Sequence, residues 1–294
     1  PTRRSSDLNT NAFYLSQVLE PLGCRVIGVP KTIDGDLQHG ADLPISFGFD
    51  TATKLYAELV GNIMRDAKSS LKYWHFVRLM GRSSSHVTLE VALQTQPAYT
   101  IISETLSNWD TLVQTIAAII KARAQQAIYH GVILIPEGLI EQLPDFRSLL
   151  DAIASNTWSD SDRNLYNTLP QSVRDQLKLK RDAHGNIPVS QIKTDDILVA
   201  ALQQTDADFK AQTHFFGYEG RCGSPTLFDS FYCLNLGKIA MALVCNYTGY
   251  LAALSQLDQA TPHALGIPLQ ALMHTEIRNT ISVEVIQKAQ IKLT

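Results

Sequence analysis

Cysteine is scarce in this sequence, and the few cysteines present form no recognisable metal-binding or disulfide pattern. The four cysteines lie at Cys24, Cys222, Cys233 and Cys245, a spacing that matches no zinc-binding pattern. A disulfide framework would need a small secreted chain with closely spaced cysteines. We therefore expect buried free thiols in a reducing cytosol.

An excess of one charge and long hydrophobic runs are also missing. The formal net charge is −3, so no strong field favours nucleic acid or a membrane surface. The longest uninterrupted apolar run, residues 239–245, is much shorter than the roughly 18–20 residues of a membrane helix. The N-terminus has charge but no apolar stretch of the kind found in signal peptides. These absences favour a cytoplasmic protein without nucleic-acid or membrane partners.

What is present is an ordinary globular composition. The chain has 294 residues, of which 45% are hydrophobic and 18% charged, enough for one large or two ordinary domains. The first eight residues, PTRRSSDL, show no periodicity and resemble a translated sequencing adapter. We expect residues 1–8 to be foreign to the fold, and the chain to lack its true N-terminal part.

Strand-like and helix-like segments alternate along most of the chain. This alternation, with strands that are apolar on both faces, predicts an α/β fold with a doubly wound parallel sheet. Between residues 143 and 211 the sequence becomes charged and helical, which indicates a helical insertion. Strands are expected at 24–29, 73–80, 99–103, 131–135 and from 214; helices are expected at 10–20, 50–67, 84–94, 111–126, 226–245 and 283–293.

Three of the predicted strands end in polar or charged residues. Lys31 and Asp34 follow the first strand, Met80-Gly81-Arg82 end the second, and Pro136-Glu137-Gly138 end the fourth. In open α/β sheets, ligands bind at the carboxyl ends of the strands. Three such endings favour one shared active-site edge.

Six motifs follow one another along the chain: 30–36 (PKTIDGD), 46–52 (SFGFDTA), 72–76 (KYWHF), 80–83 (MGRS), 136–138 (PEG) and 216–222 (FGYEGRC). Taken together and in this order, they resemble the long bacterial and plant type of pyrophosphate-dependent phosphofructokinase. The resemblance runs from Asn9 to the end of the chain. It implies a phosphofructokinase-like fold, reversible glycolytic transfer of phosphate from pyrophosphate to fructose 6-phosphate, and a requirement for Mg²⁺.

The PKTIDGD segment would carry the catalytic groups. The resemblance implies that Asp34 accepts the proton of the sugar hydroxyl and that Lys31 stabilises the transferred phosphoryl group, where negative charge must be held. A loop-capping aspartate and a surface lysine are the alternatives from the residues alone. Asp36 fits either a second carboxylate of the site or a solvated turn.

The remaining site residues would bind the sugar phosphate. A guanidinium group matches a phosphate dianion in shape and charge. Lys72 and Tyr73 align with family residues that reach the substrate of a neighbouring subunit, which implies a homo-oligomer or an α/β hetero-oligomer; a core aromatic is the alternative for Tyr73. The expected substrate-binding residues are Thr32, Ile33, Asp36, Lys72, Tyr73, Met80, Gly81, Arg82, Glu137, Tyr218, Glu219, Gly220 and Arg221.

The sequence departs from the family pattern near its start. The family has Gly-Gly-Asp-Asp-Ser before Asn-Thr-Asn, and here Ser6 stands where the magnesium-binding aspartate belongs. No metal ligand is therefore retained, and we expect little or no activity from the isolated chain. Residues 9–43 would be the remnant of a donor-binding domain, 44–142 and 212–294 the sugar-phosphate-binding core, whose later part returns to the first domain, and 143–211 the insertion.

Three other interpretations remain. An ATP-dependent relative typically has glycine at the position of Lys31, so the lysine argues against it. A non-catalytic regulatory subunit of the same fold would be expected to have lost Lys31 or Asp34. The third is an inert, poorly soluble fragment with exposed sheet edges.

Overall fold

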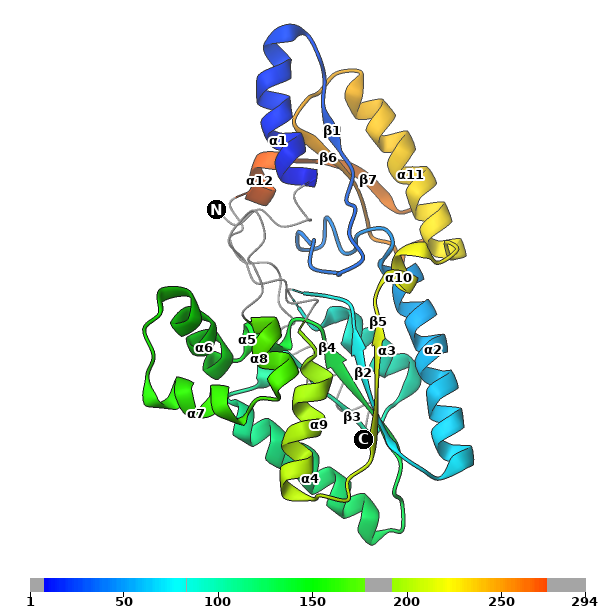
Figure 1. Cartoon of the computed structure of the whole chain (residues 1–294). Helices are drawn as coiled ribbons and strands as arrows, with labels where there is room; N and C mark the ends of the chain where they lie inside the picture. The colour runs from blue at the N-terminus through cyan, green and yellow to red at the C-terminus, as the bar shows by residue number, and fades with distance from the viewer. Residues whose placement is uncertain (1–7, 83, 178–191, 274–294) are drawn as a thin grey trace. The chain divides into compact units, whose positions relative to one another are not determined.

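The computed structural model describes residues 8–82, 84–177 and 192–273 (Figure 1). It divides into two compact units. The first unit comprises residues 8–53 and 221–273, and the second comprises the described residues between 54 and 220. The boundaries differ from the expected ones, because residues 44–53 belong with the first unit and the described part of residues 143–211 belongs with the second.

A three-stranded sheet forms the centre of the first unit. Its order is β1-β6-β7. β1 is parallel to β6, with Ile27 opposite Tyr250, whereas β7 is antiparallel to β6. The strands β6 and β7 were not predicted, so this sheet is not purely parallel as expected. The elements are α1 (Leu8–Leu19), η1 (Glu20–Leu22), β1 (Ile27–Gly28), α11 (Leu227–Val244), β6 (Tyr250–Ser255), β7 (His263–Pro268) and α12 (Leu269–Met273).

Helix α11 is unusually apolar for a helix of which little is buried. Within the described part of the chain, it is the one helix long and hydrophobic enough to cross a membrane by length and composition, and 17% of it is buried. This differs from the expectation that no segment reaches that length, because isolated polar residues interrupt the run without lowering its mean hydropathy enough. Tyr232 of α11 donates a hydrogen bond to the carbonyl of Ile45 (2.8 Å), so the helix packs against its own unit.

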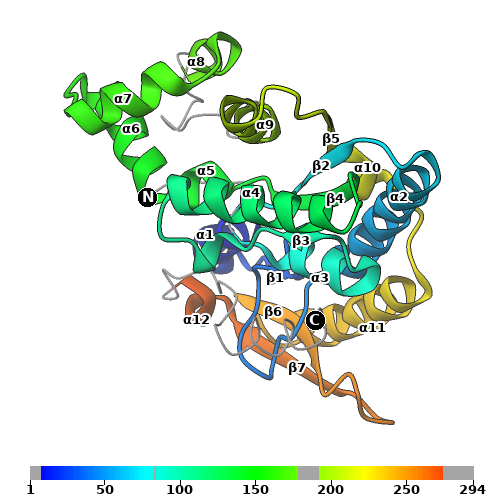
Figure 2. The same ribbon diagram turned by 90° about the horizontal axis from the view of Figure 1, so that it is seen from below.

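A four-stranded parallel sheet of order β3-β4-β2-β5 forms the second unit. Helices α4 and α9 cover one face, and α2 and α3 the other (Figure 2). The elements are α2 (Phe49–Ser70), β2 (Trp74–Leu79), α3 (His86–Thr95), β3 (Tyr99–Thr100), η2 (Ser103–Thr105), α4 (Trp109–Gln125), β4 (Gly131–Pro136), α5 (Leu139–Gln142), α6 (Pro144–Ser155), α7 (Asp160–Thr168), α8 (Gln171–Leu177), α9 (Thr194–Thr205), β5 (Ala211–Phe216) and α10 (Tyr218–Cys222).

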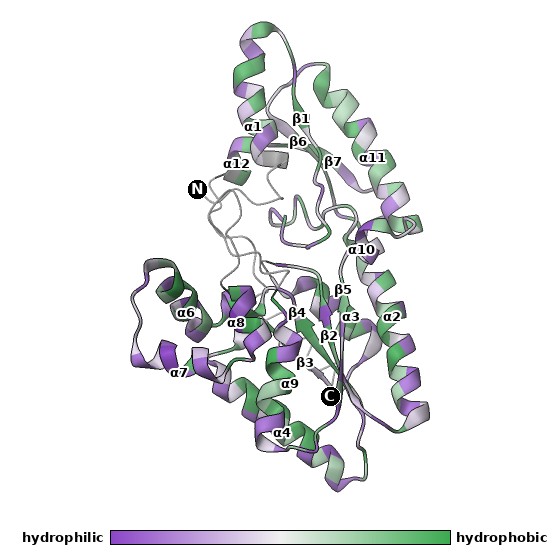
Figure 3. Ribbon diagram, viewed as in Figure 1, coloured by the Kyte–Doolittle hydropathy of each residue, from purple (hydrophilic) through white to green (hydrophobic). Residues whose placement is uncertain are grey.

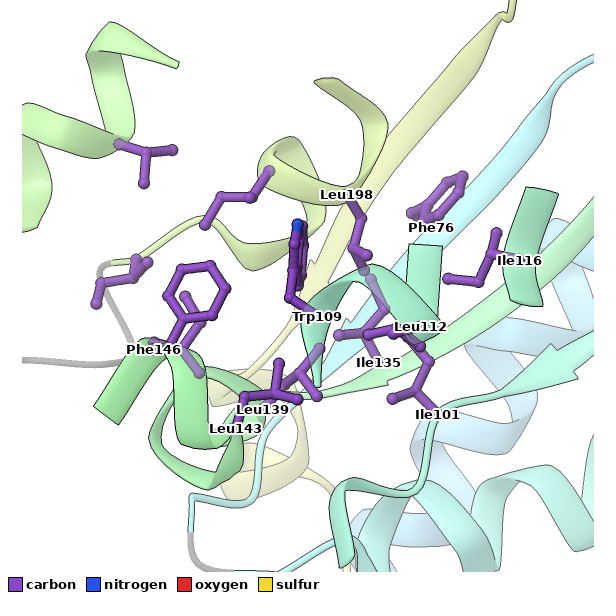
Figure 4. Packing of buried hydrophobic residues seen from close by; sticks show 14 of the residues in the cluster. Phe76, Ile101, Trp109, Leu112, Ile116, Ile135, Leu139, Leu143, Phe146 and Leu198 are labelled. Carbon is purple, nitrogen blue, oxygen red and sulfur yellow. The ribbon is translucent and has the colours of Figure 1, made fainter. Parts of the chain in front are cut away.

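The core of the second unit includes the segment that the sequence indicated to be an insertion. Phe146 of α6 packs edge-on against Trp109 of α4, with ring centroids 5.1 Å apart, and Leu198 of α9 lies in the same cluster (Figure 4). Strand β4 is hydrophobic throughout, whereas α7 is largely hydrophilic (Figure 3). The described part of residues 143–211 is mostly helical, as expected, but it belongs to one hydrophobic core with the sheet.

Two further sequence-based boundaries need correction. The strand expected from residue 214 to 221 ends at Phe216, and α10 follows, because Gly217 begins a helical turn that Gly220 closes with a 3.2 Å hydrogen bond to the Gly217 carbonyl. The strand expected at 24–29 contains two residues in β1. The helix expected at 283–293 lies outside the described residues. The four cysteines are free thiols, but they are exposed rather than buried as expected.

Candidate active site

The carboxyl ends of β2 and β4 meet in the second unit, as the sequence predicted. The two strands are neighbours, with Leu79 opposite Pro136. The Glu137 amide donates to the Leu79 carbonyl (3.0 Å), and Oε2 of Glu137 accepts a hydrogen bond from the Gly81 amide (3.1 Å). Glu137 is 1% exposed. A buried carboxylate thus holds the loop that carries Arg82.

Glycine at position 138 is required by this close approach. A Cβ atom there would overlap the carbonyl oxygen of Arg82. Gly81 has φ 137°, which side chains disfavour. The loop between Met80 and Arg82 is therefore tightly packed against the one that follows β4.

The end of β5 joins the same edge. The Met80 amide donates to the Phe216 carbonyl (3.0 Å), and the Gly217 amide donates to Oε2 of Glu219 (2.8 Å). The hydroxyl of Tyr56, on α2, donates to the Gly217 carbonyl (2.5 Å). Gly220 is buried, whereas Tyr218 is 74% exposed. Met80, Gly81, Arg82, Glu137 and residues 217–220 thus gather at one sheet edge.

The expectation of one edge shared by three polar strand ends was partly wrong. Lys31 and Asp34 follow β1, which belongs to the first unit and to the other sheet. Arg221 also belongs to the first unit and is exposed. The third polar strand end in the second unit is that of β5 instead. Local sequence cannot assign a strand to a sheet, because pairing joins residues far apart in the chain.

The PKTIDGD loop has a defined conformation in the first unit. Lys31 is exposed, Asp34 is half-buried, and Thr32, Ile33 and Asp36 are buried. The Thr32 hydroxyl accepts a hydrogen bond from the Asp34 amide (3.1 Å). A solvent-facing cation and a partly shielded carboxylate therefore stand three residues apart on one short turn. This combination suits phosphoryl transfer, in which charge is neutralised while a proton is removed.

A parallel segment supports this loop. Lys31 forms an isolated bridge with Phe47, and the Phe47 amide donates to the Pro30 carbonyl (3.0 Å). The hydroxyl of Ser46 donates to the Thr32 carbonyl (2.9 Å). The motif SFGFDTA, which the sequence singled out without a role, thus lies beside the PKTIDGD motif.

Lys72 and Tyr73 lie at the other end of β2 from Arg82. Tyr73 has φ 64° and is 39% exposed, so it is not a core residue. Both residues line a surface pocket together with Lys210. The six residues of β2 separate this pocket from the Met80–Arg82 loop, so the structure does not bring these two predicted binding residues to the sheet edge of their own unit.

No metal site emerges from the residues that the structure describes. Among them, no group of three or more His, Cys, Asp or Glu side chains is arranged to hold a metal ion. Ser6, at the position that the resemblance assigns to the magnesium ligand, lies outside the described residues.

Comparisons with known proteins show the family to which this chain is similar. The family model described as Phosphofructokinase matches residues 10–244. The chain is 41% identical to a pyrophosphate–fructose 6-phosphate 1-phosphotransferase of Treponema pallidum, covering 98% of this chain and 57% of that protein. It is 42% identical to the beta subunit of the Solanum tuberosum enzyme of the same name, covering 98% and 56%. The chain thus spans somewhat more than half the length of these relatives.

Solved structures confirm the fold. A pyrophosphate-dependent phosphofructokinase from Nitrosospira multiformis superposes with a TM-score of 0.63 at 14% identity, over 98% of this chain and 65% of that one. A pyrophosphate-dependent phosphofructokinase from Marinobacter aquaeolei gives 0.60 at 16% identity, over 98% and 66%. The α/β fold, with parallel strands and helices, is therefore one that solved proteins also adopt.

Proposed function

Because the chain belongs to the phosphofructokinase family, we propose that the protein containing it transfers phosphate from pyrophosphate to the 1-hydroxyl of fructose 6-phosphate. The observation that carries this proposal is the PKTIDGD loop, where Lys31 and Asp34 supply a cation and a base on one turn. The relatives from Treponema pallidum and Solanum tuberosum, which carry this activity in their names, support it.

The proposed reaction uses three groups of residues. The sugar 1-hydroxyl oxygen attacks the terminal phosphorus of pyrophosphate, its proton passes to Asp34, and the bridging P–O bond breaks to release phosphate. Lys31 stabilises the negative charge of the group in transfer. Arg82 and Arg221 bind the phosphate of the sugar, and Glu137 accepts hydrogen bonds from its hydroxyls. Family enzymes use a divalent metal, but no step here is assigned to it.

We further propose that the active protein is an oligomer. Lys72 and Tyr73 lie at the opposite end of β2 from Arg82, so binding of a sugar phosphate by all of them needs a second subunit. The chain is also 34% identical to an alpha subunit of the Solanum tuberosum enzyme, over 90% of this chain and 48% of that subunit. Both a homo-oligomer and a pairing of alpha-like and beta-like chains fit these observations.

A coupled assay of the complete gene product, with pyrophosphate or ATP as donor, tests the proposal. We expect turnover with pyrophosphate, and turnover with ATP alone would contradict it. Lys31→Gly should reduce the use of pyrophosphate. Asp34→Ser should abolish turnover while fructose 6-phosphate binding, measured by calorimetry, is retained. Asp42→Ser, at an exposed carboxylate of the same connection, is the matched control and should leave turnover unchanged.

A further inference from the structure

We propose that Asp229 is a positioning residue for the Lys31–Asp34 loop, although it lies far from that loop in sequence. Asp229 is in the first turn of α11 and is 3% exposed. The expected effect of Asp229 on turnover rests on the proposed function. Its effect on the conformation of the loop is argued only from hydrogen bonds within the first unit.

The starts of α2 and α11 exchange caps with each other. The Asp229 carboxylate accepts hydrogen bonds from the amides of Gly48 (2.9 Å) and Thr51 (2.9 Å) and from the hydroxyl of Thr51. In return, the Thr51 hydroxyl accepts from the amide of Thr226, the N-cap of α11 (3.2 Å). In an ordinary capping box the two reciprocal bonds lie within one helix. Here the two bonds join two helices: Asp229, the third residue of α11, caps α2, and Thr51, the third residue of α2, caps α11.

Two more bonds close the arrangement. The Thr226 hydroxyl accepts from the Asp229 amide (3.2 Å) and donates to Oδ2 of Asp50 (2.5 Å). Amide groups from the N-termini of α2 and α11 point into the exchanged caps, so a negative charge is favoured there. A carboxylate at position 229 can accept all three of its hydrogen bonds, whereas an asparagine amide would turn an N–H₂ group toward other donors.

The exchanged caps fix the segment that supports the PKTIDGD loop. Ser46 bonds Thr32 and Phe47 bonds Pro30, and these two bonds hold the loop. Gly48 comes directly after Phe47, and Thr51 lies three residues further on. A Cβ on Gly48 would lie 3.2 Å from Cγ2 of Ile33, so the two segments also touch here. The contacts therefore run from Asp229 through residues 46–51 to residues 30–34.

The consequence is catalytic rather than merely structural. If the cap is lost, residues 46–48 can shift, and Lys31 and Asp34 shift with them. Displacement of reacting groups by about 1 Å can cost on the order of 100-fold in rate. The Met80–Arg82 loop and Glu137 make none of these bonds, so their share of fructose 6-phosphate binding should persist, and KM should change less than kcat.

The test compares Asp229→Asn with a cap elsewhere in the complete gene product. Asn108 caps α4 through one bond to the Thr111 amide (2.8 Å), so Asn108→Ala is the control for a lost cap as such. We expect Asp229→Asn to lower kcat by about 10- to 100-fold, with the KM for fructose 6-phosphate changed by less than about threefold. Asn108→Ala should lower stability while kcat stays unchanged.

A conservative pair at Thr51 supplies the second variant. Thr51→Ser keeps the hydroxyl and should retain kcat, whereas Thr51→Val removes it at similar volume and should behave like Asp229→Asn. Thr51→Val keeps the side-chain volume and Thr51→Ser removes one methyl group, so both variants disturb packing less than a larger truncation would.

Hydrogen exchange of the loop amides tests the effect of Asp229 on loop conformation without any measurement of turnover. In Asp229→Asn and Thr51→Val, amides of the peptide covering residues 30–36 should exchange faster than in the wild type, and in Asn108→Ala they should not. Unchanged exchange there, with a loss of stability alone, would overturn the proposal. If the wild type does not use pyrophosphate, the proposed function fails, and exchange in residues 30–36 still decides the role of Asp229.

Discussion

At the scale of single residues, buried polar side chains decide the conformation of the loops that carry the site. Glu137 bonds the amide of Gly81, and Thr32 bonds the amide of Asp34. A buried amide without an acceptor costs free energy comparable to a lost hydrogen bond. Each of these side chains therefore holds its loop in one conformation before any substrate binds.

Glu137→Ala should destabilise the fold. The change leaves the Gly81 amide without this acceptor in a buried position, which should lower the free energy of unfolding by about 1–3 kcal/mol. Urea denaturation measures this quantity. Glu58→Ala, at an exposed position of α2, should change it by less than about 0.5 kcal/mol. Equal effects of the two changes would show that the bond to Gly81 contributes nothing.

A histidine pair should make the stability of the chain depend on pH. Nδ1 of His75 and Nε2 of His214 lie 3.0 Å apart. Burial lowers the pKa of His75, His214 lowers it further, and Asp66 acts in the opposite direction; burial also lowers the pKa of His214. Unfolded histidines keep a pKa near about 6.5. The unfolded chain therefore binds protons first, and the free energy of unfolding should fall as the pH falls below about 6.5.

This pH dependence can be measured by urea denaturation between about pH 7.5 and pH 5.5. It should become weaker in His75→Gln and in His214→Gln. The control is His263→Gln, on exposed β7, which should leave the slope unchanged. A slope that is the same in all four proteins would show that the pair does not titrate on unfolding.

At the scale of elements, a buried ion pair attaches α9 to the sheet. Nε of Arg78, on β2, lies 3.1 Å from Oδ1 of Asp195, in the first turn of α9, and both side chains are almost fully buried. The guanidinium carbon of Arg78 also lies 4.1 Å from the ring centroid of Phe215, on β5. Burial raises the pKa of Asp195 although Arg78 lowers it, so desolvation outweighs the attraction between the charges.

Asp195→Ala should therefore be strongly destabilising. It leaves the charge of Arg78 buried without this carboxylate, and such changes cost about 3–5 kcal/mol. Asp196→Ala is the matched control, because the ion pair of Asp196 with Lys193 (3.6 Å) is partly exposed to solvent and should contribute less than about 1 kcal/mol. Chemical denaturation compares the two, and similar losses would contradict the tethering role of Asp195.

At the scale of the whole molecule, the chain exposes large apolar side chains in its first unit. Leu227, Phe231, Leu234 and Met241 form a stripe along α11 at spacings of four, three and seven residues, and each is more than half exposed. Val18 and Leu22 are exposed at the end of α1 and in η1. Contiguous exposed apolar surface promotes association.

We therefore expect this chain to self-associate when produced by itself. Phe231→Glu combined with Leu234→Glu should reduce the mass measured by light scattering, because charges on the stripe oppose its burial. Gln114→Glu combined with Gln125→Glu, at exposed positions of α4, adds the same charge elsewhere and should not. A wild-type chain that is already monomeric would refute this prediction.

The sequence predicted local elements better than their partners. Lys31, Arg82 and Glu137 were placed correctly at strand ends, because a buried parallel strand is apolar throughout and ends where polar residues begin. Strand β6 was missed because its residues, YLAALS, show no alternation and suit a helix equally well. Asp229 was missed because it acts on Gly48 and Thr51, more than 170 residues away in sequence.

Residue order was enough to predict the family, most helices and strands of the sheet in the second unit, and which residue types stand at the strand ends. These follow from periodicity and motif order, which are properties of neighbouring residues. The tertiary structure alone decided that the PKTIDGD loop belongs to a different sheet from Arg82, that the helices of residues 143–211 join the main core, and that Asp229 caps α2. The physical reason is that strand pairing, core packing and exchanged caps join residues distant in the chain, and their energies depend on the positions of both partners.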